Sequence, residues 1–128
     1  MKSYFFALIC CLFLLSCTPD TSSQPEGYED FLALVDDIEI SDLLSRYSQF
    51  HPTVKGARQF IIVMTPDWDT TWGVAQLWQY NRDWVNVTSF PISVGRNGFG
   101  IGKGVISIPF GEFKKEGDGK APAGVFEL

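Results

Sequence analysis

The residues whose types and spacing could support chemistry gather near the end of the sequence, in a glycine-rich segment at residues 114–126. Gly117 and Gly119 flank Asp118, an arrangement found in parts of calcium-binding loops. Such loops use several aspartates at alternate positions and a glutamate further on, whereas this segment offers a single aspartate. We therefore expect no metal here, and interpret the segment as a turn that leads through Pro122 into a strand.

Five glycines between residues 95 and 104 suggest, at first sight, a phosphate-binding loop. The spacing argues against one. Lys103 stands where the third glycine of a dinucleotide-binding Gly-x-Gly-x-x-Gly would lie, and Gly104 stands where a P-loop requires Ser or Thr. No helical pattern follows that could direct its N-terminus at a phosphate. The glycines instead indicate tight turns and positive φ angles between strands.

All three cysteines, Cys10, Cys11 and Cys17, lie within the first 17 residues of a chain of 128. Residues 4–15 form an apolar, uncharged run that is too short to span a bilayer and is typical of an export signal over residues 1–16. Residues 14–17 (Leu-Leu-Ser-Cys) resemble the lipobox of bacterial lipoproteins, whose cysteine thiol receives a diacylglyceryl group. We therefore expect lipid attachment at Cys17 and a polar tether over residues 17–27. A plain signal peptide or a short membrane anchor is the alternative.

The lipoprotein interpretation limits the chemistry of the mature chain. Loss of the signal and acylation of Cys17 would leave no free thiol for a disulfide, a metal site or a nucleophile. The residue after the cysteine is Thr18 and not Asp, which by the lipoprotein sorting rule favours the outer membrane. The expected location is the periplasm, with a lipid anchor in the outer membrane.

After Cys17 the chain carries nine basic and fifteen acidic residues, a net charge of −6. The imbalance lies in residues 18–69, which carry −7, whereas residues 70–128 carry +1. Nucleic acids require a basic face, so we exclude a nucleic-acid partner. The length of 128 residues allows one domain, with a near-neutral surface in its C-terminal half.

Hydrophobic periodicity predicts a helical lead-in over residues 28–58. Apolar residues recur at i, i+3, i+4 and i+7 from Phe31 to Ile38, which places them on one helix face. A second short helix is expected over residues 41–50, started by Ser41 and ended before Pro52. His51 is the single histidine, and we interpret it as a surface or packing residue.

Strand patterns dominate from residue 59. Residues 60–64 form a continuous apolar run typical of a buried strand. Residues 72–80 and 84–90 alternate around the polar turn 81–83, which predicts a β-hairpin. Pro91 is expected at a sheet edge or at the start of a new strand. The sequence therefore predicts a mainly β fold with a short N-terminal helical segment.

Three segments occur in an order that resembles one family: residues 60–68, 91–98 and 114–126. We call them the three motif segments; the last contains Pro-x-Gly-x-Phe at 122–126 and is the most specific. Together they are similar to the N-terminal half of an L,D-transpeptidase catalytic domain of the YkuD type, over residues 59–128. The resemblance implies a β-sheet domain that transfers acyl groups between peptidoglycan stem peptides. It implies no cofactor, because the family uses a cysteine in a Ser-His-Gly-Cys-type segment and an upstream histidine.

The sequence departs from that family because it has no Ser-His-Gly-Cys segment, so no catalytic residue is assigned. The resemblance implies a cleft edge, for which the candidates are Lys115, Lys120, Pro122 and Gly124. The lysines could attract stem-peptide carboxylates, or simply form a solvated loop face. We expect an incomplete domain with an unpaired terminal strand at 125–128, which a missing C-terminal half or a partner chain would complete. The alternative is a non-catalytic lipoprotein that binds peptidoglycan or a partner enzyme.

Overall fold

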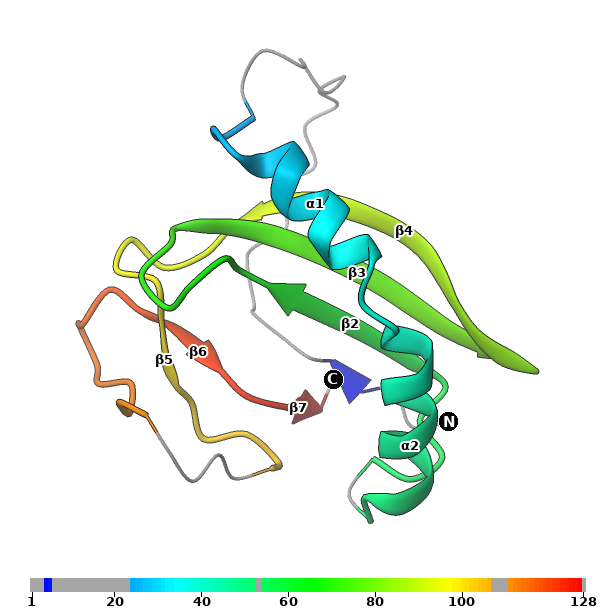
Figure 1. The fold of residues 1–128 in the computed structure, drawn as a ribbon. Coiled ribbons are helices and arrows are strands. Elements are labelled where there is room, and N and C mark those ends of the chain that lie inside the picture. The colour runs from blue at the N-terminus through cyan, green and yellow to red at the C-terminus, as the bar shows by residue number, and fades with distance from the viewer. Residues whose placement is uncertain (1–3, 6–23, 53, 107–110, 128) are drawn as a thin grey trace, which may run out of the picture.

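The computed structural model describes residues 4–5, 24–52, 54–106 and 111–127. Its centre is a three-stranded antiparallel sheet, with two helices on one side and the C-terminal strands beside it (Figure 1). In spatial order the sheet consists of β2 (Gln59–Met64), β3 (Trp72–Asn81) and β4 (Asp83–Ser93). The other elements are α1 (Tyr28–Asp36), α2 (Ile40–Phe50), β1 (Tyr4–Phe5), β5 (Phe99–Ile101), β6 (Ala121–Ala123) and β7 (Phe126–Glu127).

This architecture confirms the predicted mainly β fold with a helical N-terminal segment. Cys17 and the expected tether up to residue 23 lie outside the described residues, as does most of the expected export signal. Lipid attachment at Cys17 therefore stays a prediction. Within the part of the chain that is described, neither helix is long and apolar enough to cross a membrane.

The predicted hairpin of β3 and β4 is confirmed. The two strands pair from Trp72 opposite Ser93 to Asn81 opposite Asp83, with a register shift next to Leu77. Arg82 forms the turn with a φ of 71°, the left-handed conformation that a tight antiparallel reversal requires. β4 continues through Pro91 to its end. It lies at the edge of the sheet, where a residue without an N–H group is tolerated.

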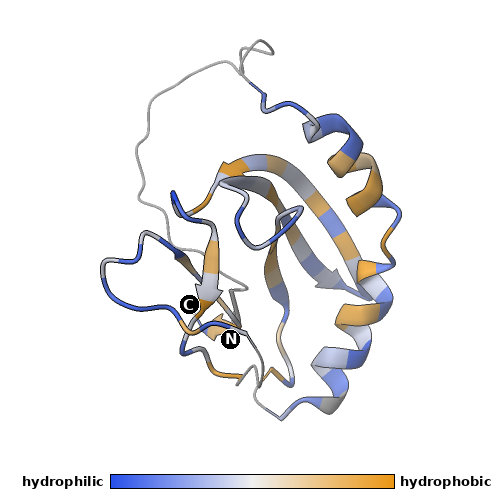
Figure 2. Ribbon diagram, turned by 60° about the vertical axis from the view of Figure 1, so that its left-hand side comes forward, coloured by the Kyte–Doolittle hydropathy of each residue, from blue (hydrophilic) through white to orange (hydrophobic). Residues whose placement is uncertain are grey.

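The core lies between the helices and the sheet face that carries Phe60 and Ile62 of β2. These side chains alternate with more exposed neighbours along the strand, as a sheet with one covered face requires. The Phe60 and Trp84 rings pack with centroids 5.2 Å apart. The buried cluster consists of Ile40, Leu44, Val54, Ala57, Phe60, Ile62, Trp84 and Val125. Val125 thus joins the third motif segment to the main core. Figure 2 shows the helices along one side of the sheet, whose strands mix hydrophobic and hydrophilic residues.

α1 is present where it was predicted, but its buried face differs from the predicted one. Tyr28 and Val35 are buried, whereas Leu34 is 61% exposed, and Ile38 lies beyond the helix. The reason is the position of Trp72, whose ring packs against Tyr28 at 6.1 Å and Phe31 at 5.8 Å. The covered stripe therefore follows residues 28, 31 and 35, a spacing that also fits one helix face.

α2 begins at Ile40, one residue before the predicted start, and Glu39 rather than Ser41 occupies the cap position without a side-chain capping bond. Its end is as predicted. His51 is extended, with φ −87° and ψ 116°, as the residue before Pro52 must be. The His51 ring stacks on Tyr47 at 5.8 Å, which suits a packing role.

β7 is paired in the described chain, but its partner β1 lies within residues 1–16, which the export-signal interpretation removes from the mature protein. β7 pairs antiparallel with β1, so that Tyr4 lies opposite Glu127 and Phe5 opposite Phe126. The preceding residue, Val125, is held by a hydrogen bond from the Val105 N–H to its carbonyl oxygen at 2.7 Å. The full chain thus pairs β7, whereas the unpaired terminal strand stays a prediction for a chain processed at Cys17.

The crowded glycines allow the backbone after the sheet to approach other segments closely. β5 pairs in parallel with β6, and Gly98 just before β5 has a φ of 72°. A Cβ atom at Gly98 would collide with the carbonyl oxygen of Trp68, and one at Gly95 would lie 2.5 Å from the Ala121 nitrogen. The prediction of positive φ angles is confirmed at Gly98, and close contact is the additional reason for glycine here.

Replacement of Gly98 by alanine should lower the free energy of unfolding more than the same change at Gly117. Both residues have positive φ angles, 72° and 78°, so both variants carry a conformational cost. That cost is ~1–2 kcal/mol for a residue with a side chain. Only at Gly98 would the new Cβ also meet the Trp68 carbonyl group, because the space around Gly117 is open. Urea unfolding of G98A, G117A and the unchanged chain measures the difference, and equal destabilisation would contradict the close contact.

Candidate binding cleft

Backbone hydrogen bonds join the second motif segment to the third, and join Phe99, directly after the second segment, to the first. The Phe99 N–H donates to the Trp68 carbonyl oxygen at 2.7 Å. The Asn97 N–H donates to the Gly119 carbonyl oxygen at 3.0 Å, and the Ala121 N–H donates to that of Gly98 at 2.8 Å. These bonds fix the loop after β2 and the segment before β6 on either side of residues 97–99.

A cleft of about 500 Å³ lies between these joined segments. We call it the Trp68 cleft, after the half-exposed indole at its side. Most of its wall is apolar, and Asp67 is the charged residue among those that line it. The lining consists of Val63, Thr65, Pro66, Asp67, Trp68, Phe99, Pro122, Ala123 and Gly124. A concave apolar wall with few polar groups is the common form of a ligand site.

The loop that carries Asp67 and Trp68 is ordered by the Asp67 carboxylate. Its Oδ1 accepts hydrogen bonds from the Thr70 hydroxyl at 2.7 Å, the Thr70 N–H at 2.7 Å and the Asp69 N–H at 2.9 Å. The Thr70 hydroxyl bond, followed by the two N–H bonds, lowers the pKa of Asp67 below its ordinary value. The carboxylate therefore stays ionised at the side of the cleft.

A second, more basic cleft of about 400 Å³ lies across Pro122, which lines both. We call it the lysine cleft, because Lys103, Lys114 and Lys115 line it together with Glu116. Phe113, which is 62% exposed, adds an aromatic surface. The remaining lining residues are Ile101, Gly102 and Pro122. The two clefts thus differ in charge and share Pro122.

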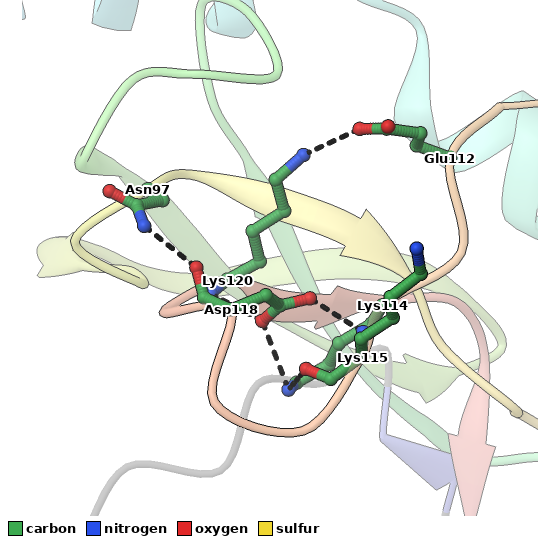
Figure 3. Close-up of polar contacts among 6 residues, drawn as sticks. All are labelled: Asn97, Glu112, Lys114, Lys115, Asp118 and Lys120. Carbon is green, nitrogen blue, oxygen red and sulfur yellow. Dashed lines mark hydrogen bonds and ion pairs between the residues drawn. The ribbon is translucent and has the colours of Figure 1, made fainter.

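The loop of residues 114–120 folds around Asp118 (Figure 3). The Asp118 carboxylate accepts the Lys115 N–H at 2.6 Å and the Lys120 N–H at 2.9 Å. These two bonds, in that order, are the main causes that lower the pKa of Asp118. The Lys114 ammonium lies 3.4 Å from the same carboxylate, and the Asn97 amide donates to the Asp118 carbonyl oxygen at 2.7 Å. Asp118 is therefore a structural residue of this loop.

The structure places the four cleft-edge candidates from the sequence at different positions. Gly124 lines the Trp68 cleft, Lys115 lines the lysine cleft, and Pro122 lines both. Lys120 forms an ion pair with Glu112 at 3.0 Å and is not among the described residues that line these two clefts. The Glu112 hydrogen bond raises the pKa of Lys120, and the same bond lowers the pKa of Glu112.

Sequence reasoning did not single out Asp67, Trp68 or Phe99 as site residues. A signal was present, because a tryptophan in a short polar loop inside a motif segment has no strand face to fill. Among the described residues, no group of three or more His, Cys, Asp or Glu side chains could hold a metal ion. The described residues of the two clefts can therefore offer a ligand apolar contact, negative and positive charges, and backbone hydrogen bonds.

No family model, curated protein or solved structure matches this chain. The likeness to L,D-transpeptidases therefore rests on the motif segments.

Replacement of Asp118 by alanine should remove hydrogen-exchange protection at the amides of Lys115 and Lys120, because both donate to its carboxylate. Glu116→Ala in the same loop is the matched control and should leave both amides protected. In the unchanged chain, the lowered pKa of Asp118 has a defined consequence. Its stabilisation is complete above pH ~4, the ordinary pKa of aspartate, and is lost as the pH falls through the lowered value. Protection at either amide that survives in D118A would contradict this account of the loop.

Proposed function

We propose that this chain is an L,D-transpeptidase-like protein of peptidoglycan remodelling and that the Trp68 cleft binds stem peptides. The observation that carries the proposal is the meeting of the motif segments. Backbone bonds at Phe99, Asn97 and Ala121 join them, and two of them, with Phe99, line one cleft. Two of the three segments that resemble one family thus contribute to one concave surface, which supports a shared binding role.

The shape and charge of the surface suit a peptide with carboxylates. A volume of about 500 Å³ lies within the range of small-molecule sites and accommodates part of a peptide in extended form. The apolar wall offers contact to small side chains. Lys103 and Lys115 in the neighbouring cleft offer cations at the far side of Pro122. Stem peptides combine small D- and L-residues with carboxylates. The small residues suit the apolar wall, and the carboxylates suit the lysine cleft.

The proposed role of residues 18–128 is binding and not turnover. These residues contain no cysteine, so they do not supply the thiol that the family uses as a nucleophile. Acyl transfer would require a cysteine-bearing segment from elsewhere, such as a partner chain. The proposal includes a lipid anchor at Cys17 that holds the cleft in the periplasm, at the outer membrane. Processing at Cys17 would remove β1 and leave β7 without this strand partner.

Titration of the chain with a synthetic stem tetrapeptide, followed by calorimetry, tests this function. We expect saturable binding, and about tenfold weaker binding by W68A, since the indole offers apolar contact area worth ~25 cal/mol per Å² buried. Leu43→Ala is the matched control, because Leu43 on α2 is as exposed as Trp68. Absence of binding, or equal loss in W68A and L43A, would overturn the proposal.

A further inference from the structure

The Trp68 cleft holds a carboxylate and an aromatic ring side by side. Asp67 and Trp68 are neighbours in sequence, both are exposed, and both line the cleft. No basic residue is among the described residues that line it. The nearest lysines of the lysine cleft lie across Pro122, and Lys120 is engaged by Glu112. The negative charge of Asp67 is thus not neutralised within the lining.

Hydrogen bonds within the loop hold the Asp67 carboxylate through one of its two oxygens. The three hydrogen bonds from Thr70 and Asp69, 2.7 to 2.9 Å long, all end on Oδ1. The Asp67 carbonyl oxygen is also fixed, because it accepts the Thr65 hydroxyl at 2.7 Å. None of these loop bonds ends on Oδ2. This oxygen is therefore positioned in advance to accept a donor from a ligand.

We propose that Asp67 and Trp68 form a recognition site for a primary ammonium group on the bound ligand. The ammonium donates to Asp67 Oδ2 and lies against the indole face of Trp68, which attracts cations through its ring quadrupole. The inference rests on the proposed function in that it names the part of the peptide that this corner of the cleft selects: an amino-bearing side chain.

The charge contrast across Pro122 gives such a ligand one direction of binding. An ammonium at Asp67 is attracted, and a carboxylate at the same place is repelled. Beside Lys103 and Lys115 in the lysine cleft, a carboxylate is attracted and an ammonium is repelled. A peptide that carries both groups therefore fits with its amino group on the Trp68 side of Pro122 and its carboxylates on the lysine side.

The direct test uses pentylammonium and its neutral analogue pentanol, observed by the NMR signals of the Trp68 indole and the Thr70 amide. We expect pentylammonium to bind more tightly than pentanol, and to bind about two- to fivefold more weakly to D67N. Asp69→Asn is the matched control, because Asp69 is exposed but does not line the cleft, and should bind pentylammonium like the unchanged chain. Equal binding of pentylammonium and pentanol, or an unchanged affinity in D67N, would overturn the site.

A loss of pentylammonium binding in D67N must be distinguished from unfolding of the loop, so its stability is measured and a second variant is available. The amide side chain introduced by D67N keeps an Oδ1 acceptor for the loop, and an unchanged unfolding midpoint of D67N confirms that the loop persists. If the midpoint falls, W68L serves instead, because leucine retains apolar bulk without a π face. W68L should lose the preference for pentylammonium over pentanol, and retention of that preference would contradict the role of the indole.

Stem peptides separate this inference from the proposed function. A peptide with a free lysine side chain is compared with the same peptide acetylated on that amine. Weaker binding after acetylation supports both ideas. Equal binding of the two peptides overturns the ammonium site and leaves the function standing. Binding of pentylammonium without binding of either peptide overturns the function and leaves the site standing.

Discussion

The cleft depends on a close backbone contact between the Gly98 region and the loop after β2. The Phe99 N–H reaches the Trp68 carbonyl oxygen at 2.7 Å, and a Cβ at Gly98 would occupy that space. The contact fixes the end of β2 against β5. The parallel pairing of β5 with β6 then brings Pro122 and Gly124 to the same cleft. One missing Cβ therefore allows distant segments to form one surface.

A second constraint is the use of aspartates as organisers of loops. The pKa of Asp67 is lowered by the Thr70 hydroxyl bond and then by two backbone N–H bonds. The pKa of Asp118 is lowered mainly by two backbone N–H bonds. The two aspartates differ in how the loop hydrogen bonds are distributed over their carboxylate oxygens. Asp118 takes N–H groups on both of its oxygens, whereas the loop bonds of Asp67 end on Oδ1. The same local chemistry thus yields a structural residue in one loop and a charge presented to a cleft in the other.

Much of the fold could be predicted because single elements bury one face. The alternation predicted β3 to within one residue, and the proline after His51 predicted the end of α2, whereas β4 extends three residues beyond its predicted end. The buried face of α1 could not be predicted, since it depends on where Trp72 of β3 lies. The pairing of β1 with β7, and the meeting of Trp68 with Phe99, join residues far apart in sequence. No local pattern encodes such contacts, nor the pairing of Lys120 with Glu112.

The first and third motif segments, together with Phe99, line the surface that we propose binds peptides. Mapping of amide chemical-shift changes during titration with a stem tetrapeptide tests this central claim most directly, because it reports every contact position at once. The account predicts changes concentrated at residues 65–68, 99 and 122–124, with weaker changes at residues 103 and 113–116. Changes confined to the helices or to β4, or none at saturating peptide, would contradict it.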